Sequence, residues 1–407
     1  MASPKLRFKE FDEDWSDSKL GQLIGISSAS RVFKEQWQTS GVPFFRTSDV
    51  VSISKNKENE KAYISLELFE ELSKKSGKIQ KGDLLVTGGG TIGIPYLVKN
   101  DEPLYFKDAD LLWMKSSGII DGSFLYNFFI SPKFREYLKS ISHTGTISHF
   151  TIEQAKVTPF QYPSKEEQTK IATFLSAVDE KISQLSQKLH LLGQYKQGMM
   201  QKLFSQQIRF KADDGREFGE WEYKPLNEIA YKNSIKNKDG NITEVLTNSA
   251  LQGVIKQSDY FDREIVTEAN LHGYYLVNIN DFVYNPRISV HAPVGPIKRN
   301  KKCLGVMSPL YTIFTVEIGN LTYLEYFFDS NFWHDYVKSV ANSGARHDRM
   351  NITNKDFFEM PVLYPCLEEQ TKIANFLSAI DQKMDVVSEQ LTQAKTWKKG
   401  LLQQMFV

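Results

Sequence analysis

The sequence predicts two α/β (α+β) domains in tandem, joined by two long helices that form an antiparallel coiled coil, with an internal pseudo-twofold repeat. Three observations predict this architecture. A segment of 39 residues occurs twice, each copy carries apolar residues at coiled-coil spacing, and a mixture of strand-like and helix-like runs precedes each copy. The length of 407 residues also exceeds that of one ordinary domain.

The repeat is ungapped and has an offset of 202 residues. Residues 166–204 read EEQTKIATFLSAVDEKISQLSQKLHLLGQYKQGMMQKLF, residues 368–406 read EEQTKIANFLSAIDQKMDVVSEQLTQAKTWKKGLLQQMF, and 19 of the 39 positions are identical. Weaker matches flank it: Leu6-Arg7-Phe8-Lys9 with Ile208-Arg209-Phe210-Lys211, Trp15 with Trp221, and Tyr137-Leu138-Lys139-Ser140 with Tyr336-Val337-Lys338-Ser339. Residues 25–130 and 231–330 share little. The frame of a module is therefore duplicated, while its middle is free to carry a different specificity.

Both copies of the repeat are predicted to be coiled-coil helices, because their apolar residues alternate four and three positions apart. The two predicted seams are Ile171, Leu175, Val178, Ile182, Leu185, Leu189 and Leu192, and Ile373, Leu377, Ile380, Met384, Val387 and Leu391. Lys196 and Lys398 interrupt the two series at the same place. Ser164 and Glu167 have capping-box spacing at the first helix start. Forty helical residues would span about 60 Å.

The simplest partner for each seam is the other copy, since the two helices are equal in length. An antiparallel pairing places the two globular parts at opposite ends of a shared rod, whereas a parallel pairing would crowd them at one end. The alternative is that each helix packs only on its own domain. The predicted segments are a first domain at 1–163, a helix at 164–206, a second domain at 207–365 and a helix at 366–407.

Within each module, strand and helix signals alternate. Residues 81–87 and 280–285 each read as a turn followed by a buried strand. Residues 124–130 and 324–328 read as short helices, and each is followed by a second helix that contains Tyr137 or Tyr336. Each module is therefore expected to be α/β or α+β.

Composition limits the class of protein. The formal net charge is +1, 41% of the residues are apolar and 13% are aromatic, which favours folded cores over disorder. Cys303 and Cys366 are too few for a disulfide framework. The first residues have no apolar signal segment, and no run approaches the roughly 20 apolar residues of a spanning helix. We expect a cytoplasmic, multidomain protein.

Motifs for catalysis are not found in the sequence. Residues 87–93 are glycine-rich but lack the Gly-Lys-Ser/Thr ending of a phosphate-binding loop, so a tight turn is the better interpretation. Asn285-Pro286-Arg287-Ile288 matches only the start of the Asn-Pro-Pro-aromatic motif of amino-methyltransferases. The seven histidines show no metal-ligand spacing, and no nucleophile motif is present. We expect no catalytic residue and no metal site in this chain.

Side chains suited to reading DNA occur at matching places in the two modules. Arginine suits guanine, and asparagine or glutamine suits adenine. The loop at 343–351 carries Arg346, His347 and Arg349, where the first module has Thr146, Ser148 and His149. Arg287, Ser289 and His291 follow a buried strand and match the glycine-rich turn that contains Thr91. Lysines at 298–302 and 74–81 would hold phosphates or form an ordinary solvated surface.

One duplicated motif is specific enough to suggest a family. It reads Glu-Glu-Gln-x-Lys-Ile-Ala-x-Phe-Leu-Ser-Ala-[Val/Ile]-Asp at 166–179 and 368–381, directly after a strand end that contains proline. Arg46-Thr47-Ser48-Asp49, residues 81–86, Gly90-Thr91-Ile92-Gly93 and Gly145-Thr146-Ile147 support it. With these motifs the whole chain resembles the specificity subunit of a type I restriction–modification system.

The resemblance implies that each module is a target-recognition domain and that the long helices pair antiparallel. It also implies double-stranded DNA and two methyltransferase subunits as partners, with restriction/translocase subunits joining the full complex. S-adenosylmethionine would belong to the methyltransferases, and this chain would bind no cofactor. Arg46 and Thr47 join the candidate DNA contacts. The second module departs from the family pattern at Asn280-Asp281, and at Pro286-Arg287 in place of a glycine-rich turn.

The resulting hypothesis is that each module reads one half of an asymmetric, bipartite DNA site. Half-sites on one face of a duplex lie about one turn, roughly 34 Å, apart, so a rigid rod between two readers would set the spacer. Two alternatives stay open. The chain could be a coiled-coil scaffold that binds proteins rather than DNA, or an enzyme with two catalytic modules.

Overall fold

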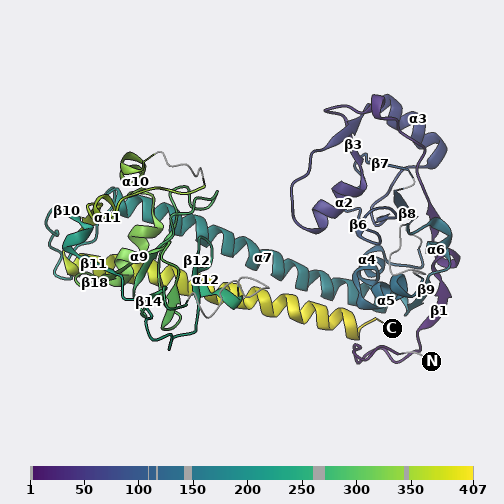
Figure 1. Ribbon diagram of the computed structural model, residues 1–407. Coiled ribbons are helices and arrows are strands. Elements are labelled where there is room, and N and C mark those ends of the chain that lie inside the picture. Colours follow the sequence, from purple (N-terminus) through teal and green to yellow (C-terminus); the bar gives the residue numbers. More distant parts are fainter. Residues whose placement is uncertain are drawn as a thin grey trace. The chain divides into compact units, whose positions relative to one another are not determined.

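The computed structural model describes residues 3–108, 110–115, 118–141, 149–259, 271–342 and 348–406. The chain forms two compact units, which are described separately (Figure 1). Unit 1 comprises residues 1–187 and 388–407, and unit 2 comprises residues 188–387. The boundary between the units therefore falls inside both long helices, so the units group the chain differently from the consecutive segments expected from the sequence. Among the described residues, no helix is long and apolar enough to cross a membrane.

Unit 1 contains a four-stranded antiparallel sheet, a three-stranded sheet and one further pair of strands. The sheet has the order β2 (Gly25–Ser27), β8 (Leu111–Lys115), β5 (Leu84–Thr87) and β6 (Pro95–Leu97). A second sheet has the order β4 (Ala62–Ile64), β3 (Val42–Phe45) and β7 (Tyr105–Phe106), and β1 (Ser16–Lys19) pairs with β9 (Pro159–Tyr162). The helices are α1 (Leu20–Leu23), α2 (Thr47–Ser54), α3 (Leu66–Ser76), α4 (Gly122–Ile130), α5 (Pro132–Ser140) and α6 (Ile152–Lys156), with a 3-10 turn at Lys34–Gln36.

Unit 2 repeats the central sheet with the same kind of strand order. The order is β11 (Ala230–Asn233), β18 (Thr312–Val316), β15 (Phe282–Tyr284) and β16 (Ile297–Arg299). Three pairs accompany it: β10 (Glu222–Pro225) with β19 (Pro361–Tyr364), β12 (Leu246–Ser249) with β13 (Gly253–Lys256), and β14 (Tyr275–Val277) with β17 (Gly305–Met307). The helices are α9 (Leu321–Asp329), α10 (His334–Val340) and α11 (Asn354–Phe358), with 3-10 turns at Leu226–Glu228 and Gln257–Asp259. The predicted α/β (α+β) modules are thereby confirmed.

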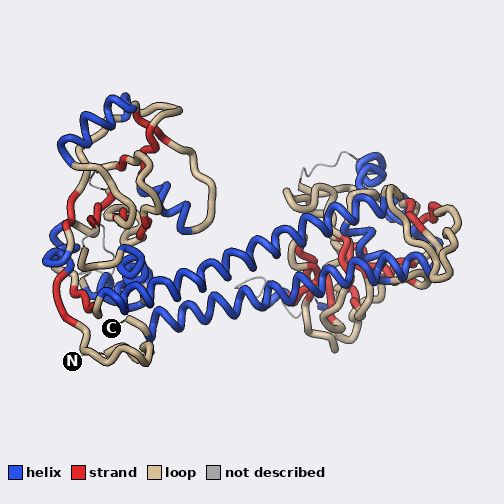
Figure 2. The backbone as a smooth tube through the Cα atoms, turned by 180° about the vertical axis from the view of Figure 1, so that it is seen from behind, coloured by secondary structure: helices blue, strands red, loops and turns tan. Residues whose placement is uncertain are grey.

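The two long helices are α7 (Lys165–Phe204) and α12 (Leu367–Gln404), and in each unit they pack against each other (Figures 1 and 2). In unit 1, the start of α7 shares a core with the end of α12: Ile171, Ala172, Leu175 and Val178 with Leu401, Leu402, Met405 and Phe406. In unit 2, the end of α7 meets the start of α12: Leu203 and Phe204 with Ile373, Ala374, Leu377 and Ile380. A start therefore meets an end in both units, which confirms the predicted antiparallel pairing.

The predicted seam residues are all buried or half-buried. The half-buried ones are Ile182, Leu189, Leu192 and Met384, and the others are buried. The seam is not a simple zipper, however, because its first turns also face their own domain. Ile171 and Leu175 belong to the cluster that contains Phe124 and Phe160 of the first module. The helix ends thus serve two purposes, helix pairing and completion of a domain core.

A buried carboxylate fastens the start of each long helix to the beginning of its module. The side chain of Glu167 is 1% exposed and accepts hydrogen bonds from Arg7 Nε (2.8 Å), Arg7 Nη2 (2.7 Å) and Trp15 Nε1 (3.4 Å). Ser164 Oγ accepts from the Glu167 N–H at 3.4 Å, but the carboxylate turns to Arg7, so the predicted capping box is only half formed. The hydrogen bond to Glu167 raises the pKa of the Arg7 guanidinium.

The second module repeats this joint. Glu369 accepts from Arg209 Nε (3.1 Å), Arg209 Nη2 (2.7 Å) and Trp221 Nε1 (2.8 Å). The neighbouring Gln370 accepts from the Asn320 N–H at the start of α9 (2.8 Å) and donates to the Pro365 carbonyl (2.8 Å). Gln168 does the same with Asp121 and Pro163 in the first module. The Glu-Gln pair of the duplicated motif is therefore a structural joint between a helix start and its domain.

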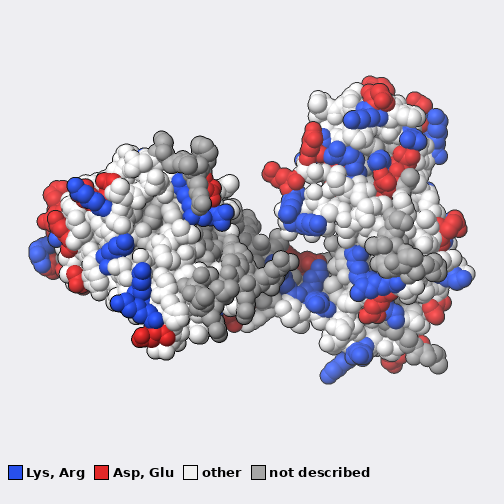
Figure 3. All heavy atoms as spheres, viewed as in Figure 1, with Lys and Arg blue, Asp and Glu red and all other residues white. Residues whose placement is uncertain are grey.

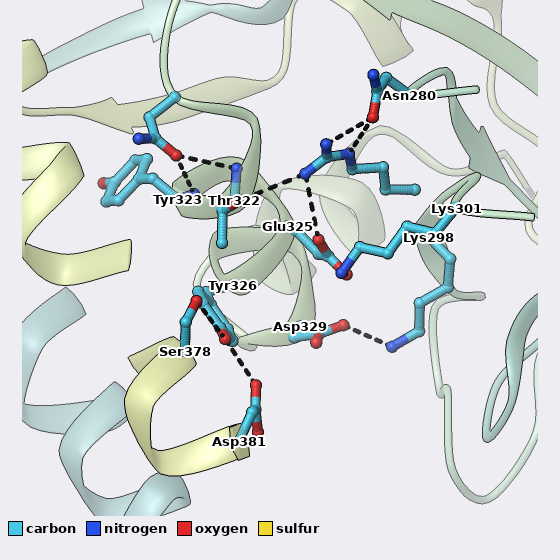
Figure 4. A network of polar contacts seen from close by, with 12 residues as sticks. Asn280, Lys298, Lys301, Thr322, Tyr323, Glu325, Tyr326, Asp329, Ser378 and Asp381 are labelled. Carbon is cyan, nitrogen blue, oxygen red and sulfur yellow. Dashed lines mark hydrogen bonds and ion pairs between the residues drawn. The ribbon is translucent and has the colours of Figure 1, made fainter. Parts of the chain in front are cut away.

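The two lysines that interrupt the seams form ion pairs across the helix pairs. Lys196 Nζ lies 2.6 Å from Asp381 Oδ1 in unit 2, and Lys398 Nζ lies 2.5 Å from Asp179 Oδ1 in unit 1. The Tyr326 hydroxyl of α9 also donates to Asp381 Oδ2 at 2.6 Å, and burial together with this hydrogen bond raises the pKa of Tyr326 (Figure 4). These ion pairs fix the register of the helices, and the pattern of apolar residues alone does not predict them.

Replacing the buried carboxylate tests the joint. Glu167→Ala leaves the Arg7 and Trp15 donors without their partner, so we expect unit 1 to lose about 2 kcal/mol of unfolding free energy. Urea unfolding followed by tryptophan fluorescence measures it. Glu166→Ala is the matched control, because Glu166 is exposed on the same helix turn and its removal should cost less than about 1 kcal/mol. Equal losses for the two variants would contradict the role of Glu167.

Candidate nucleic-acid interface

In each unit, the segment that follows the central strand pairs with the segment that follows the second short helix. In unit 1, Gly89 forms an antiparallel bridge with His149, and the Phe150 N–H donates to the Gly88 carbonyl at 2.7 Å. In unit 2, Arg287 bridges Arg349, and the Met350 N–H donates to the Pro286 carbonyl at 2.9 Å. The same backbone junction is therefore built twice with different side chains. We call the two places the first and second strand–loop junctions.

The second junction opens into a cavity of about 590 Å³. Arg287, Ser289, His291 and Arg349, all candidate DNA contacts, line it. Arg287 and His291 are exposed and Arg349 is half-buried. Asp348 lies 3.7 Å from Arg287 Nε and 3.8 Å from Arg349 Nε, which is a long, weak pairing at a solvent-exposed site. The two guanidinium groups thus stay available to an incoming acceptor.

Asn248 also lines this cavity, and its residue type alone did not single it out. Its Nδ2 donates to the carbonyls of Val283 (2.7 Å) and Pro296 (3.1 Å), and the residue is 3% exposed. Its Oδ1 is buried and has no hydrogen-bond partner among the described residues. An unmatched buried acceptor costs free energy unless a ligand or water supplies a donor. The available signal was an asparagine inside the strand-like run Val245-Leu246-Thr247-Asn248-Ser249.

The first junction is a compact turn. Thr47 Oγ1 donates to the Asp110 carbonyl at 3.4 Å, and the Gly88 N–H donates to the same carbonyl at 2.8 Å. Gly90 has a φ of +68°, which favours glycine, and a Cβ there would lie 3.8 Å from Thr47 Cγ2. Thr91 is exposed. The structure thus brings Thr47, Thr91 and His149 to one turn, consistent with a tight turn rather than a phosphate-binding loop.

Arg46 is held by its own module. Its Nε lies 2.8 Å from Asp49 Oδ2, its Nη2 donates to the Glu60 carbonyl, and its guanidinium lies 5.6 Å from the centre of the Trp37 ring. Burial acts to raise the pKa of Asp49, but hydrogen bonds from Arg46 and Asn59 outweigh it, so the pKa lies below its ordinary value. These contacts fix the start of α2 and occupy most of the donors of Arg46.

Most of the basic clusters that could hold phosphates are paired with acidic residues. Lys298 Nζ lies 2.5 Å from Asp329, Lys301 Nζ lies 2.6 Å from Glu325, and Arg299 binds Asn280 and Glu325 (Figure 4). In unit 1, Lys75 and Lys78 pair with Glu71 and Glu70. On the face seen in Figure 3, basic and acidic side chains of unit 1 lie interspersed. These clusters are therefore mixed charged surfaces.

Four candidate contacts, Thr146, Ser148, Arg346 and His347, lie outside the described residues. Among the residues that the structure describes, no group of three or more His, Cys, Asp and Glu side chains could hold a metal ion.

Comparison with known proteins gives a consistent result. Residues 12–192 match the family model described as "Type I restriction modification DNA specificity domain". A putative type I restriction enzyme MjaX specificity subunit from Methanocaldococcus jannaschii is 25% identical over 421 residues, 98% of this chain and 94% of that protein. A putative type I restriction enzyme specificity subunit from Haemophilus influenzae is 27% identical over 175 residues, and the alignment spans 42% of each protein.

Solved structures match the fold across the chain. The S subunit of a type I restriction–modification system from M. genitalium has a TM-score of 0.57 at 15% identity, over 100% of this chain and 99% of that one. The HsdS subunit from Thermoanaerobacter tengcongensis has a TM-score of 0.51 at 16% identity, over 97% of each chain. The chain is therefore similar to type I restriction–modification specificity subunits over nearly its whole length, and the family model itself covers residues 12–192. The internal repeat carries the duplicated motif of this region into the second module, beyond residues 12–192.

If the second junction contacts DNA, its shape should affect the affinity for DNA, and two glycines test this separately from backbone strain. Gly295 has a φ of +82°, and a Cβ there would lie 2.1 Å from the Asn285 carbonyl oxygen. Gly253 has a φ of +70° with nothing within 4 Å of a Cβ. Each change to alanine costs about 1 kcal/mol of left-handed strain, measured by thermal unfolding. Gly295→Ala should additionally displace Asn285 and weaken DNA binding. Equal DNA affinities for the two variants would contradict a role of the second junction in DNA binding.

Proposed function

We propose that this chain is the DNA-reading subunit of a type I restriction–modification complex, in which each module reads one half of an asymmetric, bipartite site. One observation carries the proposal. The same backbone junction presents Gly89 and His149 in the first module, but Arg287 and Arg349 in the second. A duplicated scaffold with different side chains at the same place is what two unlike half-sites require.

The chemistry of the second junction favours a site that contains guanine. Arginine donates two parallel hydrogen bonds to guanine O6 and N7, and each such pair discriminates against a wrong base by about 1–3 kcal/mol. Two arginines flank the second junction, while the first offers the smaller polar side chains of Thr47, Thr91 and His149. The two modules therefore suit different sequences.

We further propose that two methyltransferase subunits dock on surfaces of the long helices that occur twice. Glu166, Ala177 and Lys181 are exposed in α7, and the identical Glu368, Ala379 and Lys383 are exposed in α12. Spacings of eleven and four residues place such a set on one face of a helix. Restriction/translocase subunits join this core, the methyltransferases supply S-adenosylmethionine and the chemistry, and this chain contributes no catalytic group.

Substitution of a junction arginine tests the half-site assignment. Arg287→Ala removes a donor from the second junction, so DNA affinity should fall by about 1–3 kcal/mol and selectivity should relax in one half-site only. Methylation by the reconstituted complex on a library of duplexes measures both. Arg216→Ala is the control, because Arg216 is an exposed arginine of the same unit that pairs with Asp214. Relaxation in both halves, or in neither, would contradict independent modules.

The paired helices are proposed to set the distance between the half-sites. The pairs Lys196–Asp381 and Lys398–Asp179 have the same antiparallel register, which makes residues 185–191 of α7 and residues 386–392 of α12 the matching heptads for a deletion. Deleting both heptads keeps the seam in phase and shortens the helices by about 10 Å. We expect the preferred spacer to shorten by about three base pairs in a methylation assay.

The matched control replaces the same two heptads with alanine-rich sequence of equal length that keeps Leu185, Leu189, Val387 and Leu391. This variant should retain the wild-type spacer. An unchanged spacer in the deletion variant would rule out a helical ruler.

A further inference from the structure

A groove in unit 1 gathers positively charged side chains. It has a volume of about 440 Å³ and lies between α5 and the last turns of α12, where Arg135 faces Lys395, Lys398 and Lys399. Asp179 is the one acidic residue that lines it. We propose that this basic groove binds phosphates of the DNA backbone beside the first half-site. The proposal rests on the proposed DNA-reading function, and it adds contacts to backbone phosphates at the first half-site only.

The charge in the basic groove is not neutralised from within. Asp179 is bound by Lys398 at 2.5 Å, which leaves Arg135, Lys395 and Lys399 without an ion pair to any described residue. The one described hydrogen bond of the Arg135 side chain runs from Nη1 to the Ile92 carbonyl at 3.2 Å. Burial lowers the pKa of Arg135, since desolvation disfavours its charge and no carboxylate offsets it. Three cations around one groove make a site for an anion with several acceptor oxygens.

The position of the basic groove links it to DNA reading. Ile92 follows Thr91 in the glycine-rich turn of the first junction, and a Cβ on Gly93 would lie 3.0 Å from Phe134 and 3.3 Å from Arg135 Nη1. The turn that carries candidate base contacts therefore packs directly on α5. Phosphate contacts normally accompany base contacts and set the orientation of the protein on the duplex. A duplex read by this turn would bring its backbone to the same helix.

The internal repeat identifies the class of ligand. In the corresponding positions of unit 2, Arg135 is replaced by His334, Lys395 by Gly193 and Lys399 by Gln197, whereas the pair of Lys398 and Asp179 recurs as Lys196 and Asp381. Burial lowers the pKa of His334, so it carries little charge at neutral pH. A protein partner that docks twice on the repeated frame would meet the same residues twice. The charges of the groove occur in one unit only, so they suit a ligand whose two halves differ. The asymmetric DNA duplex is such a ligand.

Salt dependence of DNA binding tests the basic groove. The full chain is titrated against a labelled duplex that carries the methylated sequence and against a scrambled duplex. The wild type is compared with a triple variant that combines Arg135→Gln, Lys395→Gln and Lys399→Gln. Fluorescence anisotropy is recorded over a range of salt concentrations. The slope of log K against log salt is negative, and each lost phosphate contact reduces its magnitude by about 0.9. The magnitude should therefore decrease by about 2.7, with the ratio of specific to scrambled affinity unchanged.

The control neutralises three exposed lysines of the same unit, Lys5→Gln, Lys9→Gln and Lys165→Gln, and should leave the slope near the wild-type value. Because Arg135 is half-buried, the double variant Lys395→Gln and Lys399→Gln, which leaves Arg135 in place, is measured as well. It should reduce the magnitude of the slope by about 1.8. A wild-type slope in both groove variants overturns the proposal. Loss of methyltransferase binding with an unchanged slope overturns it as well, because the groove would then be a protein-docking site. If the wild-type chain prefers neither duplex, the proposed function itself fails.

Discussion

The last turn of each long helix completes the core of the unit in which the other long helix begins. Phe204 packs beside Tyr323 and Phe327 in unit 2, and Phe406 packs on Phe124 in unit 1. Neither core is built from a continuous stretch of chain. The antiparallel pairing is therefore a condition for two folded modules as well as a connection between them, and the buried Glu167 and Glu369 fix the point where each helix leaves its module. This constraint explains why the helices and their flanks repeat more closely than the module middles.

The periodicity of the sequence was enough to predict the helices, and the equal length of the two seams predicted that they pair with each other. Their antiparallel direction was predicted from the crowding of the two modules that a parallel pairing would cause. It was not enough to show that Ile171 and Leu175 also face their own module, since one apolar side chain can touch a helix and a sheet at once. The repeat of Arg7 and Trp15 as Arg209 and Trp221 was visible, but their common partner, a carboxylate 160 residues downstream of each arginine, depends on the tertiary fold.

For the candidate DNA contacts too, the sequence predicted some features and only the tertiary structure showed others. The match between the loops that contain His149 and Arg349 placed them at equivalent positions, and the bridges to Gly89 and Arg287 give that match a physical basis. Residue type alone could not separate an arginine at a cavity, such as Arg287, from Arg46, whose donors serve Asp49 and Glu60. Nor could it find Asn248, whose importance comes from a buried oxygen without a partner among the described residues.

A doubled frame that presents two different readers to one DNA molecule should determine the pattern of DNA methylation. A direct measurement is to express the chain together with the methyltransferase subunits of a type I system and to map every methylated base in the genome of the expression host. We expect a single target sequence with two unlike halves and a gap of fixed length. A continuous target, a palindrome, or a methylation pattern that does not depend on this chain would contradict it.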